Sequence, residues 1–198
     1  MPFVFKRLAL LISIAAAFAA DKDAPFRPGP AGSYPHRQTS ERVTIAASPY
    51  NSGDRIKDAF GKLDPYQHGV LPVLIVIQND SAQTLQLDRM DLWYMGPNHD
   101  KVEATPAADV KYVGSSPHRP GTVPVPGKVI VMPGKKSPLD VWEIEGRAFT
   151  AKMIPPGQTA SGFFYFQTGM QRGSTVYLSG LREAASGKEL LFFEIPLE

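Results

Sequence analysis

Residues 70–79 read VLPVLIVIQN, and this stretch decides the fold. It is apolar at both odd and even positions, which predicts a central β-strand that is covered on both faces. Pro72 lies near its start, where a missing backbone donor is tolerated, and Asn79-Asp80-Ser81 supplies turn chemistry at its end. A second stretch of this kind, GFFYFQT at 162–168, is also apolar on both faces. We therefore expect a β-rich body whose central strands need a layer on each side.

Further strands are expected before, between and after these two stretches. They are predicted at 41–47, at 85–94 with a break at Asp88-Arg89, at 129–132, at 175–179 and at 190–196. Most of them follow one another along the chain with turn residues between them, such as Ser186-Gly187-Lys188. This arrangement favours a mainly β protein with an antiparallel sandwich.

Two short helices are predicted, each with apolar residues on one side. We expect these sides to pack against the strands that are apolar on both faces. The first is expected at 55–60, after a cap at Asp54 and before a stop at Gly61. The second is expected at 139–153, although Gly146 weakens this prediction and a strand at 147–154 is the alternative. Its predicted stripe consists of Leu139, Trp142, Phe149 and Met153.

Two segments carry a resemblance to a known class of domain. They are VLIVIQNDSAQTLQL at 73–87 and IPPGQTASGFFYF at 154–166. An apolar strand that ends in an Asn-centred turn, and a Pro-Gly turn before an aromatic strand, resemble bacterial extracytoplasmic immunoglobulin-like β-sandwich domains. The resemblance implies an immunoglobulin-like sandwich outside the cytoplasm, and it implies no catalytic residue.

The N-terminus has the pattern of a secretory signal peptide at 1–19. Lys6 and Arg7 precede the apolar run 8–18, and Ala17-Phe18-Ala19 fits the small-x-small cleavage rule. We expect an exported protein, periplasmic or extracellular, without a stable membrane anchor after cleavage; an uncleaved N-terminal anchor is the alternative. The predicted mature chain is formally neutral, which argues against a nucleic-acid partner.

The rest of the chain is expected to form one domain. Residues 20–40 contain four prolines and two glycines, so we expect a linker without regular structure. Residues 41–198 are expected to be a single β-sandwich domain. Within it, residues 96–138 lose periodicity and contain eight prolines and five glycines, which predicts a long irregular insertion.

The sequence contains no catalytic signature. It has no cysteine, its four histidines form no zinc motif, and it lacks the nucleophile-elbow and phosphate-loop patterns. No catalytic residue, metal site or cofactor is therefore predicted.

The expected binding residues come from the 96–138 insertion and its border. This segment has a local excess of basic side chains, and an aromatic side chain lies next to it. The candidates are Trp93, His99, Lys111, His118, Arg119, Lys135 and Lys136. Such a loop is able to contact a partner protein or an anionic cell-envelope polymer, although solvated lysines explain the same pattern.

Three functions are compatible with these observations. The first is an exported, non-catalytic interaction module that binds a protein or an envelope component through its loops. The second is a carbohydrate-binding module that uses exposed aromatic side chains near Trp93, and the third is a hydrolase whose site is scattered over loops. The sequence favours the first.

Overall fold

The computed structural model describes residues 26–114, 122–125, 128–131 and 137–197, with only the backbone described between 122 and 131. The predicted signal peptide at 1–19 lies outside the described residues. Most described residues in regular structure are in strands, and every pairing between strands is antiparallel. The prediction of a mainly β, antiparallel protein is therefore confirmed.

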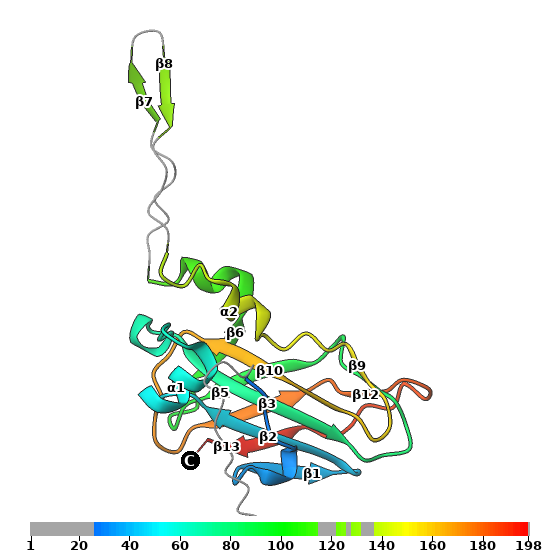
Figure 1. Ribbon diagram of the computed structural model, residues 1–198. Coiled ribbons are helices and arrows are strands. Elements are labelled where there is room, and N and C mark those ends of the chain that lie inside the picture. Colours follow the sequence, from blue (N-terminus) through cyan, green and yellow to red (C-terminus); the bar gives the residue numbers. More distant parts are fainter. Residues whose placement is uncertain (1–25, 115–121, 126–127, 132–136, 198) are drawn as a thin grey trace, which may run out of the picture.

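Eight strands form the main sheet, in the order β1-β2-β3-β10-β6-β5-β11-β13 (Figure 1). They are β1 (Arg37–Ser40), β2 (Val43–Pro49), β3 (Leu71–Asn79), β5 (Asp91–Met95), β6 (Lys101–Thr105), β10 (Thr159–Phe166), β11 (Thr175–Ser179) and β13 (Phe193–Pro196). A small sheet has the order β12-β4-β9, and β7 pairs only with β8. These strands are β4 (Leu85–Gln86), β7 (Thr122–Val125), β8 (Lys128–Val131), β9 (Met153–Ile154) and β12 (Arg182–Glu183).

The main sheet bends where β10 meets β6. These strands pair at only two positions, Tyr165 with Thr105 and Phe166 with Ala104. The sheet thereby divides into a first half, β1-β2-β3-β10, and a second half, β6-β5-β11-β13. The two outermost strands approach each other, and the backbone N–H of Glu194 in β13 donates to Oε1 of Gln38 in β1 at 2.7 Å. The sheet is therefore nearly closed into a barrel around an inner core.

The central strand β3 is buried on both faces, as its sequence predicts. Its odd-numbered apolar side chains join an inner hydrophobic cluster, which also receives Tyr94 and Phe193 from the second half. Leu74 and Val76 point the other way, into an outer cluster together with Phe163 and other side chains. The first half of the sheet is thus enclosed between two apolar layers.

Helices provide the outer layer over the first half of the sheet. Helix α1 (Gly53–Phe60) ends at Gly61, as predicted, and buries Ile56, Ala59 and Phe60 against this sheet. Three 3-10 turns lie at Ala31–Ser33 (η1), Tyr66–His68 (η2) and Ala107–Tyr112 (η3), and the first and third bury residues in the same cluster.

The second predicted helix is much shorter than expected. Helix α2 covers only Trp142–Gly146, because the chain then leaves the helix and the carbonyl of Arg147 accepts a hydrogen bond from the backbone N–H of Phe163 in β10. Trp142 and Met153 are 70% and 55% exposed, so the predicted apolar stripe is wrong. The alternative strand at 147–154 is correct only for β9 and for an isolated bridge at Ala148.

Two segments that were expected to be irregular contain strands. Residues 37–40, at the end of the predicted linker, form β1, and Ala31 is fully buried before it. Within the predicted irregular insertion 96–138, residues 101–105 form β6 of the main sheet and residues 107–112 form η3. Both strands are short and only partly buried, so their sequences carry a weak apolar pattern.

Candidate functional site

One segment of the chain crosses the main sheet beside β10, on the side where β6 pairs only briefly, and we call residues 145–152 the crossing segment. The backbone N–H of Phe163 donates to the Arg147 carbonyl at 2.8 Å, and Phe149 N–H donates to the Phe163 carbonyl at 3.1 Å. Ala148 packs with the outer cluster and Phe149 with the inner one, so the chain changes layers here. The crossing depends on Gly162, because a Cβ atom there would lie 2.5 Å from the Phe149 nitrogen.

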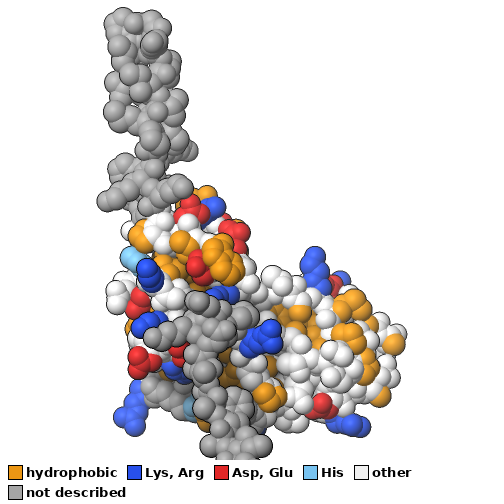
Figure 2. All heavy atoms as spheres, in the orientation of Figure 1, with side chains coloured by type: hydrophobic (Ala, Val, Ile, Leu, Met, Phe, Trp, Pro, Cys, Tyr) orange, Lys and Arg blue, Asp and Glu red, His pale blue; other side chains and the backbone are white. Residues whose placement is uncertain are grey.

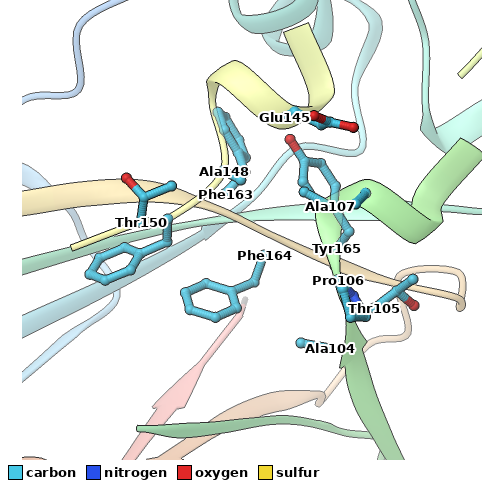
Figure 3. Close-up of a pocket in the computed structure, with 12 residues that line it drawn as sticks. Ala104, Thr105, Pro106, Ala107, Glu145, Ala148, Thr150, Phe163, Phe164 and Tyr165 are labelled. Atoms are coloured by element: carbon cyan, nitrogen blue, oxygen red, sulfur yellow. The ribbon is translucent and has the colours of Figure 1, made fainter. Parts of the chain in front are cut away.

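A cavity of about 400 Å³ lies between the crossing segment and residues 104–108. In Figure 3, the Tyr165 ring of β10 points toward Glu145 and α2, whereas the Phe164 ring points to the other side of the strand. Most of the lining is methyl groups and rings. The residues are Ala104, Thr105, Pro106, Ala107, Ala108, Glu145, Ala148, Phe149, Thr150, Phe163, Phe164 and Tyr165.

The hydroxyl group of Tyr165 has a fixed partner in this wall. It donates to the Ile144 carbonyl at 2.7 Å, and both groups are buried. Burial raises the pKa of Tyr165 above its ordinary value, and the nearby positive charge of Arg147 acts in the opposite direction. The phenol therefore stays neutral and holds α2 against β10, so we assign it a structural role rather than an acid-base role.

A second cavity of about 510 Å³ adjoins the first. The two share Phe149, Thr150 and Phe164, and the two phenyl rings are 5.4 Å apart and tilted by 28°. We call the two cavities together the groove. The second cavity adds Leu87, Asp88, Met90, Ala151 and Lys152 to the lining.

An unpaired strand edge runs beside the groove. Strand β10 pairs with β3 along its whole length but with β6 only at Tyr165 and Phe166, and the backbone of Phe163 bonds to the crossing segment. Because backbone groups alternate in direction along a strand, Thr159 and Ser161 direct their N–H and C=O groups to the same edge as Phe163. Both residues are exposed, and no described strand pairs with them on this edge.

The charged groups near the groove are few and separated. Glu145 lines the first cavity, whereas Asp88 and Lys152 line the second. Among the residues that the structure describes, no group of three His, Cys, Asp or Glu side chains is arranged to hold a metal ion. This surface is therefore suited to hold apolar side chains and to hydrogen-bond an extended backbone.

The structure describes the side chains of three of the seven predicted binding residues, Trp93, His99 and Lys111. Trp93 lies on the outward side of β5, with Lys101 Nζ 5.7 Å from its ring centroid. His99 lies in the turn between β5 and β6 with a positive φ of 63°, and Lys111 lies in η3, beside the Tyr112 ring. The other four candidates, His118, Arg119, Lys135 and Lys136, lie outside the residues whose side chains are described.

The groove residues Phe149, Ser161 and Phe164 are missing from the sequence-based candidates. One signal for them exists in the sequence, because a glycine inside an apolar strand pattern, here Gly162, indicates a close approach of another backbone. The sequence does not identify the segment that approaches.

The visible surface has a mixed character. On the face in Figure 2, hydrophobic side chains lie among scattered basic and acidic ones, and neither sign of charge forms a continuous patch. Apolar and hydrogen-bonding contacts are therefore better suited to recognition on this face than bulk charge.

Comparison with protein-family models and with curated protein sequences identifies no relative for this chain. It matches no protein-family model, and no curated protein sequence shows significant similarity to it. Within the described part of the chain, no helix has both the length and the apolar character that crossing a membrane requires.

Proposed function

We propose that this protein is an exported, non-catalytic binding module that holds an extended segment of a partner protein in the groove. The observation that carries this proposal is the unpaired edge of β10 at Thr159 and Ser161, which runs beside two adjoining apolar cavities. An extended peptide that adds to a sheet edge gains affinity from backbone hydrogen bonds and specificity from side-chain pockets.

The position of the cavities fits such a ligand. A strand added beside Ser161 places alternate side chains on the side of the sheet where Phe149 and Phe164 lie. Apolar side chains there would cover these two rings. Glu145 at the first cavity favours a Lys or Arg at the neighbouring ligand position, because this carboxylate is the charged group of that cavity.

We further propose that the domain is an immunoglobulin-like sandwich outside the cytoplasm. Three observations support this assignment. The main sheet has two halves around one inner core, the two resemblance segments include most of β3 and all of the adjacent β10, and the N-terminal sequence has signal-peptide character. A chain without cysteine also needs no disulfide for stability in an oxidising compartment.

Selection from a random peptide library on the purified mature protein tests the proposed function. We expect the enriched peptides to be extended, with alternating apolar residues and a basic residue. The Ser161→Pro variant removes an edge-facing N–H group and should lower the affinity for synthetic versions of the selected peptides by about tenfold or more. Ser161→Ala is the matched control, because it changes the side chain and keeps the N–H group, and it should bind normally.

A second variant tests the groove independently of the strand edge. Ala108→Phe places a large side chain in the lining of the first cavity and should weaken the same peptides, while its melting temperature stays close to that of the unmodified protein. The proposal is overturned if the library yields no binder, or if selected peptides bind both Ser161→Pro and Ala108→Phe as tightly as the unmodified protein.

A further inference from the structure

A row of four side chains crosses the outer face of the second half of the sheet. Trp93 in β5 is paired in register with Glu103 in β6 on one side and with Tyr177 in β11 on the other. Tyr177 is in turn paired with Glu194 in β13. The row therefore reads Glu103, Trp93, Tyr177, Glu194 across four adjacent strands, with two aromatic rings between two exposed carboxylates.

The rings of this row are held in place by their neighbours. Trp93 Nε1 donates to Asp91 Oδ2 at 2.7 Å, and Lys101 Nζ lies 5.7 Å from the same ring. Tyr177 stacks on Phe192, with 5.2 Å between centroids and 26° between planes, and Phe192 is 49% exposed. Such contacts fix the ring orientations before any ligand arrives, so less conformational entropy is lost on binding.

These rings do not serve the hydrophobic core. Trp93, Tyr177 and Phe192 belong to neither of the two clusters that the described residues form. The outer face of the first half of the sheet is covered by α1 and the 3-10 turns, whereas no described helix covers this outer face of the second half. Phe192 is exposed and Trp93 and Tyr177 are partly exposed, so the three rings form an aromatic patch that solvent or a ligand can reach.

We propose that this outer face binds a neutral glycan chain. One face of a sugar ring is a patch of C–H groups, which packs on an aromatic ring, and its edge carries hydroxyl groups, which donate to carboxylates. Neighbouring strands are about 4.8 Å apart, so the two aromatic residues lie side by side and the backbones of Glu103 and Glu194 are about 14 Å apart across them. The row thus offers apolar contact at its centre and hydrogen-bond acceptors at both ends.

The charges on this face select the type of ligand. Asp91, Glu103 and Glu194 place three carboxylates on the strands of this face, against the ammonium group of Lys101, so the face disfavours anionic polymers. An apolar protein surface would have to desolvate these carboxylates without giving them hydrogen bonds. A neutral, hydroxyl-rich chain is not repelled by the carboxylates, and its hydroxyl groups donate hydrogen bonds to them. This site is separate from the groove, and the inference does not rest on the proposed peptide binding.

The two tryptophans of the chain, Trp93 and Trp142, allow a direct test. The variant Trp142→Phe leaves Trp93 as the only tryptophan fluorophore. We titrate it with soluble neutral oligosaccharides (β-glucans, xylans, mannans and N-acetylated chitooligosaccharides) and with polygalacturonate as the anionic arm. Saturable change of the Trp93 emission is expected with at least one neutral glycan and not with polygalacturonate.

Variants of the row distinguish specific binding from a general effect. Tyr177→Ala and Phe192→Ala should each lower the affinity for the bound glycan by about tenfold, since each removes a stacking surface. Ser161→Pro should leave glycan binding unchanged, which separates this inference from the proposed peptide site. Circular dichroism confirms that each variant is folded. The inference is overturned if no neutral glycan alters the Trp93 emission or retards the protein in affinity electrophoresis, if polygalacturonate alone binds, or if both folded ring variants bind as tightly as the parent.

Discussion

The side-chain amide of Asn79 donates a hydrogen bond to the carbonyl of Ile154 at 2.9 Å, and this contact joins the end of β3 to β9. The same amide donates to the Gln83 carbonyl at 2.8 Å, while Asn79 Oδ1 accepts from the backbone N–H and the hydroxyl of Ser81. The residue is fully buried, so all four hydrogen-bonding positions of its side chain are used inside the protein.

Replacing this side chain should destabilise the protein. In Asn79→Ala, the buried Ile154 carbonyl loses its side-chain donor and the Gln83 carbonyl keeps only the Ser81 hydroxyl, so we expect the free energy of unfolding to fall by about 3 kcal/mol. Urea unfolding at neutral pH measures this change. Gln83→Ala is the control, because Gln83 contributes its backbone carbonyl, which the substitution keeps. A loss below about 0.5 kcal/mol in Asn79→Ala, the usual range for surface substitutions, would contradict this account.

Gly162 should tolerate no larger residue. A Cβ atom at this position would lie 2.5 Å from the Phe149 nitrogen and 2.8 Å from the Ala148 carbonyl carbon, so the crossing segment would have to move away from β10. We expect Gly162→Ala to destabilise the protein by about 1–3 kcal/mol and to change the groove. Gly53→Ala is the matched control, since a Cβ there has no neighbour within 4 Å. Equal melting temperatures for the two variants would refute the prediction.

Stability should fall at alkaline pH. Burial raises the pKa values of Tyr34, Tyr50 and Tyr165, so the folded state favours the neutral phenols. The neutral phenols make their full contribution to the free energy of unfolding below the ordinary tyrosine pKa of about 10. This contribution is lost as the pH rises through the higher pKa values of the folded state. Tyr165→Phe should be less stable than the parent at pH 7, because the Ile144 carbonyl loses its hydrogen-bond donor. Above pH 10, its free energy of unfolding should fall less steeply than that of the parent. Urea unfolding between pH 8 and 11 measures the free energy of unfolding of the variant and the parent. If this free energy falls equally in both proteins, Tyr165 is not a source of the pH dependence.

The hairpin between β1 and β2 can be stabilised by a glycine. Its two-residue turn consists of Glu41 and Arg42, whose φ angles are +48° and +63°. Side chains are disfavoured in this left-handed region, and turns of this kind normally contain glycine. Glycine removes the strain of the left-handed conformation, but it also increases the entropy of the unfolded chain. We expect the net effect of Arg42→Gly to be a rise of roughly 0.5–1 kcal/mol in the free energy of unfolding. Arg42→Ala, which keeps a Cβ, should give no gain in the same thermal melts.

The elements that were predicted correctly have local signals. Strand β3 follows from a long apolar run that ends in turn residues, and α1 follows from three apolar side chains on one helical face before Gly61. Strand β6 was missed because its sequence is short and half polar, and only pairing with β5 and β10 makes it a strand. Strand β1 was missed for a similar reason, since its polar residues gain order from β2.

The candidate site was less accessible to sequence reasoning than the fold. Trp93 was identified because it borders an irregular segment, but its neighbours Tyr177 and Phe192 come from the end of the chain. Their contact depends on the strand order and register of the main sheet, which no local pattern records. The groove depends in the same way on the crossing segment, whose path follows from its hydrogen bonds to Phe163 rather than from its own periodicity.

The meeting of β1 and β13 has a consequence for the order in which the chain assembles. Ribosomes make the N-terminal residues first, so Gln38 exists long before Glu194, its hydrogen-bonding partner, has been synthesised. Until β13 has been made, the inner core lacks Phe193 and Ile195 and has an open seam. A chain that lacks β13 therefore exposes apolar surface along that seam, and exposed surface of this kind favours aggregation.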